Sequence, residues 1–149
     1  MDYVAAEEAV KQIICKSGAP SVLQSVVDYL YKHFDTYSWV GIYLVDGEYL
    51  VLGSWNGMQA TEHTKISIGE GICGSAVQTG KTELVSDVSK DWRYLSCFVS
   101  TRSEIVVPIK KQGVVIGEID VDSDIFDAFN ESDVVFLEKV ADMLAKHIC

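Results

Sequence analysis

Two pairs of strand-like segments, each joined by a tight turn, constrain the fold of this chain more than any other feature. Residues 37–45 and 48–57 are rich in aromatic and β-branched side chains, and they flank Asp46-Gly47, a dipeptide typical of two-residue hairpin turns. Residues 103–109 and 113–123 form a second such pair around the turn "KKQG". Because hairpins join antiparallel strands, the sequence predicts a mainly antiparallel sheet.

Amphipathic helices are expected at both ends of the chain. Residues 2–16 look helical, and a break follows at "KSGAP". Ser21 is a suitable N-cap for a second helix, whose apolar positions recur at helical spacing: Leu23, Val26, Val27, Leu30 and Phe34. Asn130 is suited to cap a last helix, which has acidic residues in its first turn and the apolar face Val134, Leu137, Val140, Leu144 and Ile148. We therefore expect an antiparallel α+β domain with helices on one sheet face.

The middle of the chain is less regular. Residues 63–68 ("HTKISI") are consistent with a third strand, and residues 69–81 ("GEGICGSAVQTGK") with glycines followed by a short helix that carries Cys73 in its first turn. Residues 82–88 are interpreted as a short extended segment. Residues 89–102 lack periodicity, and a long loop with one helical turn is expected there.

Length and charge limit the classes of function. A chain of 149 residues suits one domain with one core, and 48% apolar with 23% charged residues indicates a globular protein. The formal net charge of −10 disfavours nucleic acid and anionic membranes as partners. The N-terminal segment lacks the basic and apolar regions of a signal peptide, and no window has the length of a membrane span. We expect a cytoplasmic protein.

The four cysteines do not form a recognisable metal motif. No CxxC pair occurs, and the histidines do not combine with the cysteines at zinc-site spacings, so no metal site is expected. Cys97 lies in a polar loop. Cys73 lies early in its helix, where the helix dipole favours a lowered thiol pKa. Core packing remains the alternative for both thiols, and Cys15 and Cys149 are interpreted as structural or surface thiols.

Three carboxylates accompany apolar strand sequence. Glu104 opens the run "IVVPI", either as an exposed strand end or at the edge of a pocket. Asp120 and Asp122 are two residues apart and therefore share one strand face. If that face is not simply solvated, two like charges there need a cation or a shared proton, and the latter suits a general acid. Trp39 and Tyr43 also share a strand face, with core packing as their simplest role.

Taken together, these motifs resemble a known family. The chain resembles GAF domains, and in particular the free methionine-(R)-sulfoxide reductases, which are single GAF domains. The segments that carry the resemblance are "WVGIYLV", "LVLGSWNG", "ISIGEGICGSAVQTGK", "SEIVVPIKKQGVVIGEIDVDS" and "FLEKVADMLA". The resemblance covers roughly Ser21 to the C-terminus. It implies one GAF domain over 1–149, with 1–19 as an N-terminal helical extension, a central antiparallel sheet with the terminal helices on one face, and a ligand pocket under loops on the other.

The resemblance also implies roles for individual residues. The nucleophilic cysteine of the family lies seven residues before the glutamate of "SEIV", which makes it Cys97 here, and the second cysteine is Cys73 in "GICG". The aromatic pair of the substrate pocket corresponds to Trp39 and Tyr43. The pocket carboxylates, with catalytic and substrate-binding roles, correspond to Glu104, Asp120 and Asp122.

Two positions depart from the pattern of the family. A further cysteine that many members carry ten residues before the "GICG" cysteine is His63 here, which leaves Cys73 as the expected resolving thiol. The aspartate that follows the nucleophile in the family is Phe98 here, which affects the local activation of Cys97.

The implied activity is thiol-dependent reduction of free methionine (R)-sulfoxide. Cys97 attacks the sulfoxide sulfur, a sulfenic acid forms, and a second thiol resolves it to a disulfide. No bound cofactor is expected. The reductant would be an external dithiol, either thioredoxin-like or dithiothreitol in vitro, and the chain could be a monomer or a homodimer. The alternatives are a non-catalytic GAF module that binds a small ligand such as a cyclic nucleotide, and a thiol redox sensor.

Overall fold

The structure is a computed structural model that describes residues 1–16, 21–95 and 98–148. Within these residues the helices are α1 (Tyr3–Lys16), α2 (Ser21–His33), α3 (Gly71–Thr79), α4 (Glu131–Ala145) and the 3₁₀ turn η1 (Val88–Lys90). The strands are β1 (Trp39–Asp46), β2 (Tyr49–Gly57), β3 (Lys65–Ser67), β4 (Glu83–Val85), β5 (Ser103–Lys111) and β6 (Val114–Ser123). None of the helices in this part of the chain is long and apolar enough to cross a membrane.

The six strands form one sheet in the order β3-β2-β1-β6-β5-β4, with every neighbouring pair antiparallel. Both predicted hairpins are confirmed. β1 and β2 turn at Gly47 with a φ of 63°, while β5 and β6 turn at Gln112 and Gly113, both at positive φ. These left-handed conformations match the primed turns that follow the twist of antiparallel strands. The central position of β1 and β6 places their residues in the middle of the domain.

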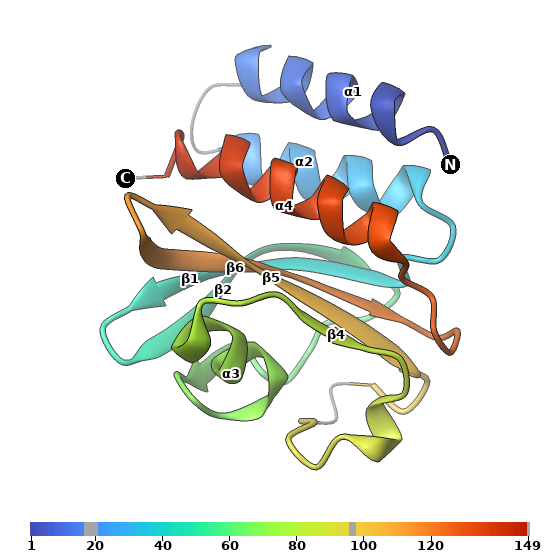
Figure 1. The fold of residues 1–149 in the computed structure, drawn as a ribbon, viewed down its shortest axis with the longest axis vertical. Coiled ribbons are helices and arrows are strands. Elements are labelled where there is room, and N and C mark those ends of the chain that lie inside the picture. The colour runs from blue at the N-terminus through green and yellow to red at the C-terminus, as the bar shows by residue number, and fades with distance from the viewer. Residues whose placement is uncertain (17–20, 96–97, 149) are drawn as a thin grey trace.

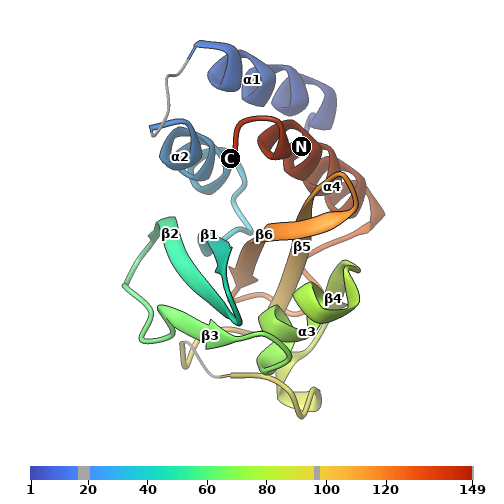
Figure 2. The same cartoon turned by 90° about the vertical axis from the view of Figure 1, so that its left-hand side faces the viewer.

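The helices divide into two groups around the sheet. Helices α2 and α4 cover one face, α1 lies across them on the side away from the sheet, and α3 with the irregular segment after β4 covers the opposite face (Figure 1; Figure 2). The expected α+β arrangement, with the terminal helices on one face, is therefore confirmed. Side chains along β6 alternate between the two faces of the sheet. Ile119 and Val121 pack in the core between the sheet and the helices, and Asp120 and Asp122 point to the opposite face.

The start of α4 is fixed by a buried polar network. Asn130 and Asp133 form a capping box, in which each side chain accepts a hydrogen bond from the backbone N–H of the other. The hydroxyl of Tyr37, just before β1, donates a hydrogen bond of 2.7 Å to Asp133 Oδ1. Because Tyr37 and Asp133 are both buried, this contact ties the last helix to the entrance of the central strand.

Removing the Tyr37 hydroxyl is expected to destabilise the fold. Tyr37→Phe leaves a buried carboxylate oxygen without its donor, which should lower the free energy of unfolding by about 1–3 kcal/mol. Urea denaturation followed by circular dichroism measures the change. Tyr31→Phe is the matched control, because Tyr31 on α2 is partly exposed and its hydroxyl makes no hydrogen bond to the residues described. Equal stability of the two variants would contradict the structural role of the Tyr37 contact.

Candidate active site

The hairpin of β5 and β6 carries three carboxyl groups into the interior opposite the helical core. Glu104, Asp120 and Asp122 have only 3%, 1% and 2% of their surface exposed. Glu104 lies directly opposite Asp122 in the register, and Asp120 lies one step further along the same face of β6. The sequence left open that Glu104 is an exposed strand end and that the face of the two aspartates is solvated. Both of these interpretations are wrong, because all three carboxyl groups are buried. The sequence pattern placed the aspartates on one face but did not show that α3 covers it.

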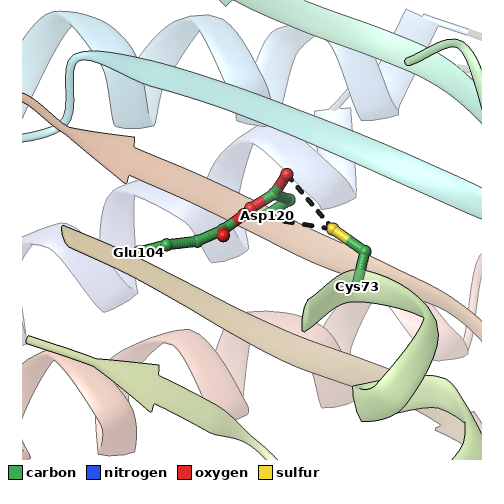
Figure 3. Close-up of side chains that lie close together, drawn as sticks. All are labelled: Cys73, Glu104 and Asp120. Carbon is green, nitrogen blue, oxygen red and sulfur yellow. Dashed lines mark hydrogen bonds between the residues drawn. The ribbon is translucent and has the colours of Figure 1, made fainter. Parts of the chain in front are cut away.

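Helix α3 adds a thiol to these carboxyl groups. The Sγ atom of Cys73 donates a hydrogen bond of 3.4 Å to Asp120 Oδ2 and lies 4.0 Å from Glu104 Oε2. Figure 3 shows the thiol pointing from the helix toward both carboxyl groups on the underlying strands. Residues from three elements far apart in the sequence therefore meet in one buried cluster.

Burial raises the pKa of every group in this cluster, and neighbouring carboxyl groups add to the effect on Cys73, Glu104 and Asp122. Burial raises the pKa of Cys73 well above its usual value, and the carboxyl groups of Asp120, Glu118 and Glu104 raise it further. The expectation that the helix dipole lowers the pKa of Cys73 is therefore wrong, because desolvation and nearby carboxyls outweigh the dipole. Burial also raises the pKa of Glu104 and Asp122 well above the ordinary range, with the Asp120 carboxyl adding to both, and burial raises the pKa of Asp120. Such carboxyls hold protons at pH values where exposed ones have lost them.

Trp39 borders a small pocket beside the cluster. The pocket has a volume of about 70 Å³ and is lined by Ser38, Trp39, Met58, Gln59, Phe98, Ser100, Thr101, Asp122 and Asp124. Trp39 lies opposite Asp122 in the pairing of β1 with β6, which explains why both reach the same pocket. The Trp39 and Phe98 rings are tilted by 50°, with centroids 5.8 Å apart.

Glycine residues make room for the Trp39 indole. A Cβ atom at Gly41 would lie 2.3 Å from the Trp39 ring, and one at Gly57 would lie 2.4 Å from it. Both distances are far below the normal contact distance between carbon atoms. Glycine is therefore required at positions 41 and 57 for the indole to occupy this place.

The other residues predicted for the site lie at different places. Tyr43 is buried on the same strand face as Trp39 but does not line the pocket, and its hydroxyl donates a 2.7 Å hydrogen bond to the carbonyl oxygen of His63. Cys97 and Cys149 lie outside the described residues. Phe98, which follows Cys97, forms part of the pocket wall, and Cys15 is exposed on α1.

Sequence reasoning missed a fourth buried carboxyl group, Glu118. It is 0% exposed, lies on the same face of β6 as Asp120, and acts on the pKa of Cys73. Its own pKa is raised well above the ordinary range, chiefly by burial and next by Asp120. The signal was present as the i, i+2, i+4 spacing of Glu118, Asp120 and Asp122, which places all three on one face.

Several buried polar atoms of the site have no hydrogen-bond partner among the described residues. They are Trp39 Nε1, both carboxyl oxygens of Asp122 and of Glu118, and Asp120 Oδ1. Buried polar groups are normally paired, so a group of orphaned atoms beside a pocket indicates a site for a polar ligand. The donor is the Trp39 indole N–H on β1, and the acceptors are carboxyl oxygens on the neighbouring strand β6. This arrangement suits a ligand that carries both acceptor and donor groups.

Comparisons with known proteins identify the family of this chain. The GAF domain family model matches residues 19–148. GAF domain-containing protein A of Dictyostelium discoideum is 42% identical, over 82% of this chain and 76% of that protein. The free methionine-R-sulfoxide reductase of Escherichia coli is 32% identical, over 78% of this chain and 70% of that protein.

A solved structure extends the similarity to the fold. The free methionine-R-sulfoxide reductase of Neisseria meningitidis, in complex with its substrate, superposes with a TM-score of 0.90 at 33% identity, covering 97% of this chain and 86% of that one. Sequence and fold lead to one assignment. The chain belongs to the GAF domain family and, within it, to the free methionine-R-sulfoxide reductases.

Proposed function

We propose that this chain reduces free methionine (R)-sulfoxide to methionine, with electrons from thiols. The observation that carries the proposal is the buried contact of Cys73 with Asp120 and Glu104, on the strands that border the Trp39 pocket. Membership of the reductase family supports it. A buried cluster of this kind would supply the two things that the reaction needs, a sulfur and an acid.

The orphaned polar atoms suit the free amino acid as substrate. Its ammonium group would be held by Asp122 and its carboxyl neighbours, whose oxygens lack partners among the residues described. The indole of Trp39 would cover the methyl group, and its unpaired N–H is available to an acceptor oxygen of the substrate. An amino group in a peptide bond carries no charge, so this mode of binding favours the free amino acid over peptide-bound sulfoxide.

The chemical step would begin at Cys97. Its thiolate attacks the sulfoxide sulfur, and a carboxyl group that keeps its proton transfers it to the sulfoxide oxygen. The raised pKa of Glu104 suits this acid role. As the S–O bond breaks, the oxygen passes to Cys97 as a sulfenic acid and methionine leaves. The sulfur of the substrate gains two electrons, and Cys97 is oxidised by the same two.

Cys73 would resolve the sulfenic acid. Its sulfur attacks the Cys97 sulfur, a disulfide forms, and the hydroxyl leaves as water with the proton from the Cys73 thiol. Asp120, the acceptor of the Cys73 hydrogen bond, would take that proton and pass it to the departing hydroxyl group. A thioredoxin-type dithiol, or dithiothreitol in vitro, then reduces the disulfide and returns both thiols to the start.

Replacing the two cysteines should separate the two steps. With dithiothreitol as reductant, Cys97→Ser should abolish reduction of free methionine (R)-sulfoxide, because no sulfur is left to attack. In a single-turnover reaction without dithiothreitol, which would itself reduce a sulfenic acid, Cys73→Ser should convert one equivalent of substrate and then hold Cys97 as the sulfenic acid, detectable with a sulfenic acid probe and mass spectrometry. Cys15→Ser, which removes the exposed thiol of α1, should behave as wild type. Disulfide cycling without any turnover of (R)-sulfoxide would instead favour a redox sensor.

Removing the acid should slow catalysis without unfolding the protein. Glu104→Gln keeps the size of the side chain but cannot donate an acidic proton, so kcat should fall by roughly 100-fold or more. Steady-state kinetics with free methionine (R)-sulfoxide measures the loss, and circular dichroism checks the fold. Glu62→Gln, at an exposed position, is the control. Full activity of Glu104→Gln would exclude the proposed acid.

Displacing Trp39 without changing a polar group should also impair the enzyme. In Gly41→Ala the new methyl group overlaps the indole, so the ring must leave its place in the pocket wall. We expect kcat/KM to fall by roughly 10- to 100-fold, since small misplacements of pocket groups have effects of that order. Gly53→Ala is the matched control, because its added Cβ meets only an ordinary contact at 3.4 Å. Similar kinetics of the two variants would contradict the role given to Trp39.

A further inference from the structure

The cluster of Cys73, Glu104 and Asp120 has the dimensions of a metal site. One ligand atom from each residue, a sulfur and two carboxylate oxygens, lies within 4.8 Å of the other two. With Zn–S near 2.3 Å and Zn–O near 2.0 Å, a tetrahedral zinc ion separates a sulfur ligand from an oxygen ligand by about 3.5 Å. The sulfur of Cys73 lies 3.4 Å from Asp120 Oδ2 and 4.0 Å from Glu104 Oε2, on either side of that value.

An unpaired polar atom points independently to a cation at this place. Asp120 Oδ1 is buried and accepts no hydrogen bond from the described part of the chain. The ion pairs that the described lysines and arginines form all involve other carboxylates, at the surface. Among the described residues, no lysine or arginine forms an ion pair with the acidic cluster, so its charge must be balanced by bound protons or by a cation that enters.

We propose that the reduced protein binds one Zn²⁺ through Cys73 Sγ, Asp120 and Glu104. On binding, the thiol releases its proton to solvent and coordinates as thiolate. A thiolate with carboxylates favours zinc over magnesium and calcium, which prefer oxygen ligands alone.

Zinc at this place would exclude turnover. The Cys73 sulfur that would coordinate the metal is the one proposed to resolve the sulfenic acid, and the Glu104 carboxyl group is the proposed acid. Zinc would therefore act as a reversible inhibitor of the reduced enzyme, and oxidation or alkylation of Cys73 would remove a ligand and release the metal. Binding itself follows from the geometry and does not require the proposed activity.

A zinc titration of the full-length reduced chain tests the proposal. Zn²⁺ is added in competition with a chromophoric zinc chelator, after removal of the reductant, and bound metal is followed by absorbance. Wild type and Cys15→Ser should each bind one Zn²⁺ per chain. Cys73→Ser should weaken binding by roughly 100-fold or more, because the only sulfur ligand of the set is lost. Mg²⁺ should not compete.

Cobalt identifies the ligand directly. Co²⁺ replacing zinc should give the ultraviolet thiolate-to-cobalt charge-transfer band and intense visible bands of a tetrahedral site, and Cys73→Ser should lose the charge-transfer band. Asp120→Asn, with its fold checked by circular dichroism, should also weaken binding, so that the test does not depend on one variant. Unchanged zinc affinity in folded Cys73→Ser, or a loss that follows Cys15→Ser instead, would overturn the proposal. Because metal binding is measured without substrate, its outcome is independent of whether the chain reduces methionine sulfoxide.

Discussion

The organisation of the site depends on one costly feature, the burial of four carboxyl groups on a single face of the β5–β6 hairpin. Removing a carboxylate from water is unfavourable unless it is protonated or paired, and the described chain supplies no lysine or arginine to pair these. The helical core on the opposite face and the covering α3 helix hold the hairpin in this arrangement (Figure 1). The stability of the rest of the domain therefore maintains a cluster that is unfavourable by itself and ready for a positively charged ligand.

That single arrangement supports both proposals. The ammonium group of an amino acid and a zinc ion are both cations that relieve the repulsion between the carboxyl groups, but they use different chemistry. The ammonium group needs acceptor oxygens only, whereas zinc also takes the sulfur of Cys73 (Figure 3). A cluster that would hold an ammonium group next to a thiol would thus also hold a thiophilic metal, and we expect occupancy by one to exclude the other.

Much of the fold could be predicted from local patterns. The Asp46-Gly47 and "KKQG" turns, the helical stripe of α2 and the Asn130 cap each depend on interactions between residues close in the sequence. The acidity of Cys73 could not be predicted in this way. Its place in the first turn of α3 favours a lowered pKa, but the groups that raise the pKa come from β5 and β6, more than thirty residues away in the chain.

By itself, the sequence determined the strands, the turns, the common face of Asp120 and Asp122, and the motifs that resemble the reductase family. Those properties follow from backbone periodicity and turn chemistry, which act over a few residues. Only the tertiary structure decided that this face is buried and that Tyr43 lies outside the pocket lining that includes Trp39. Burial depends on which element packs on a strand, and here α3 reaches the hairpin through a packing interaction that no local pattern encodes.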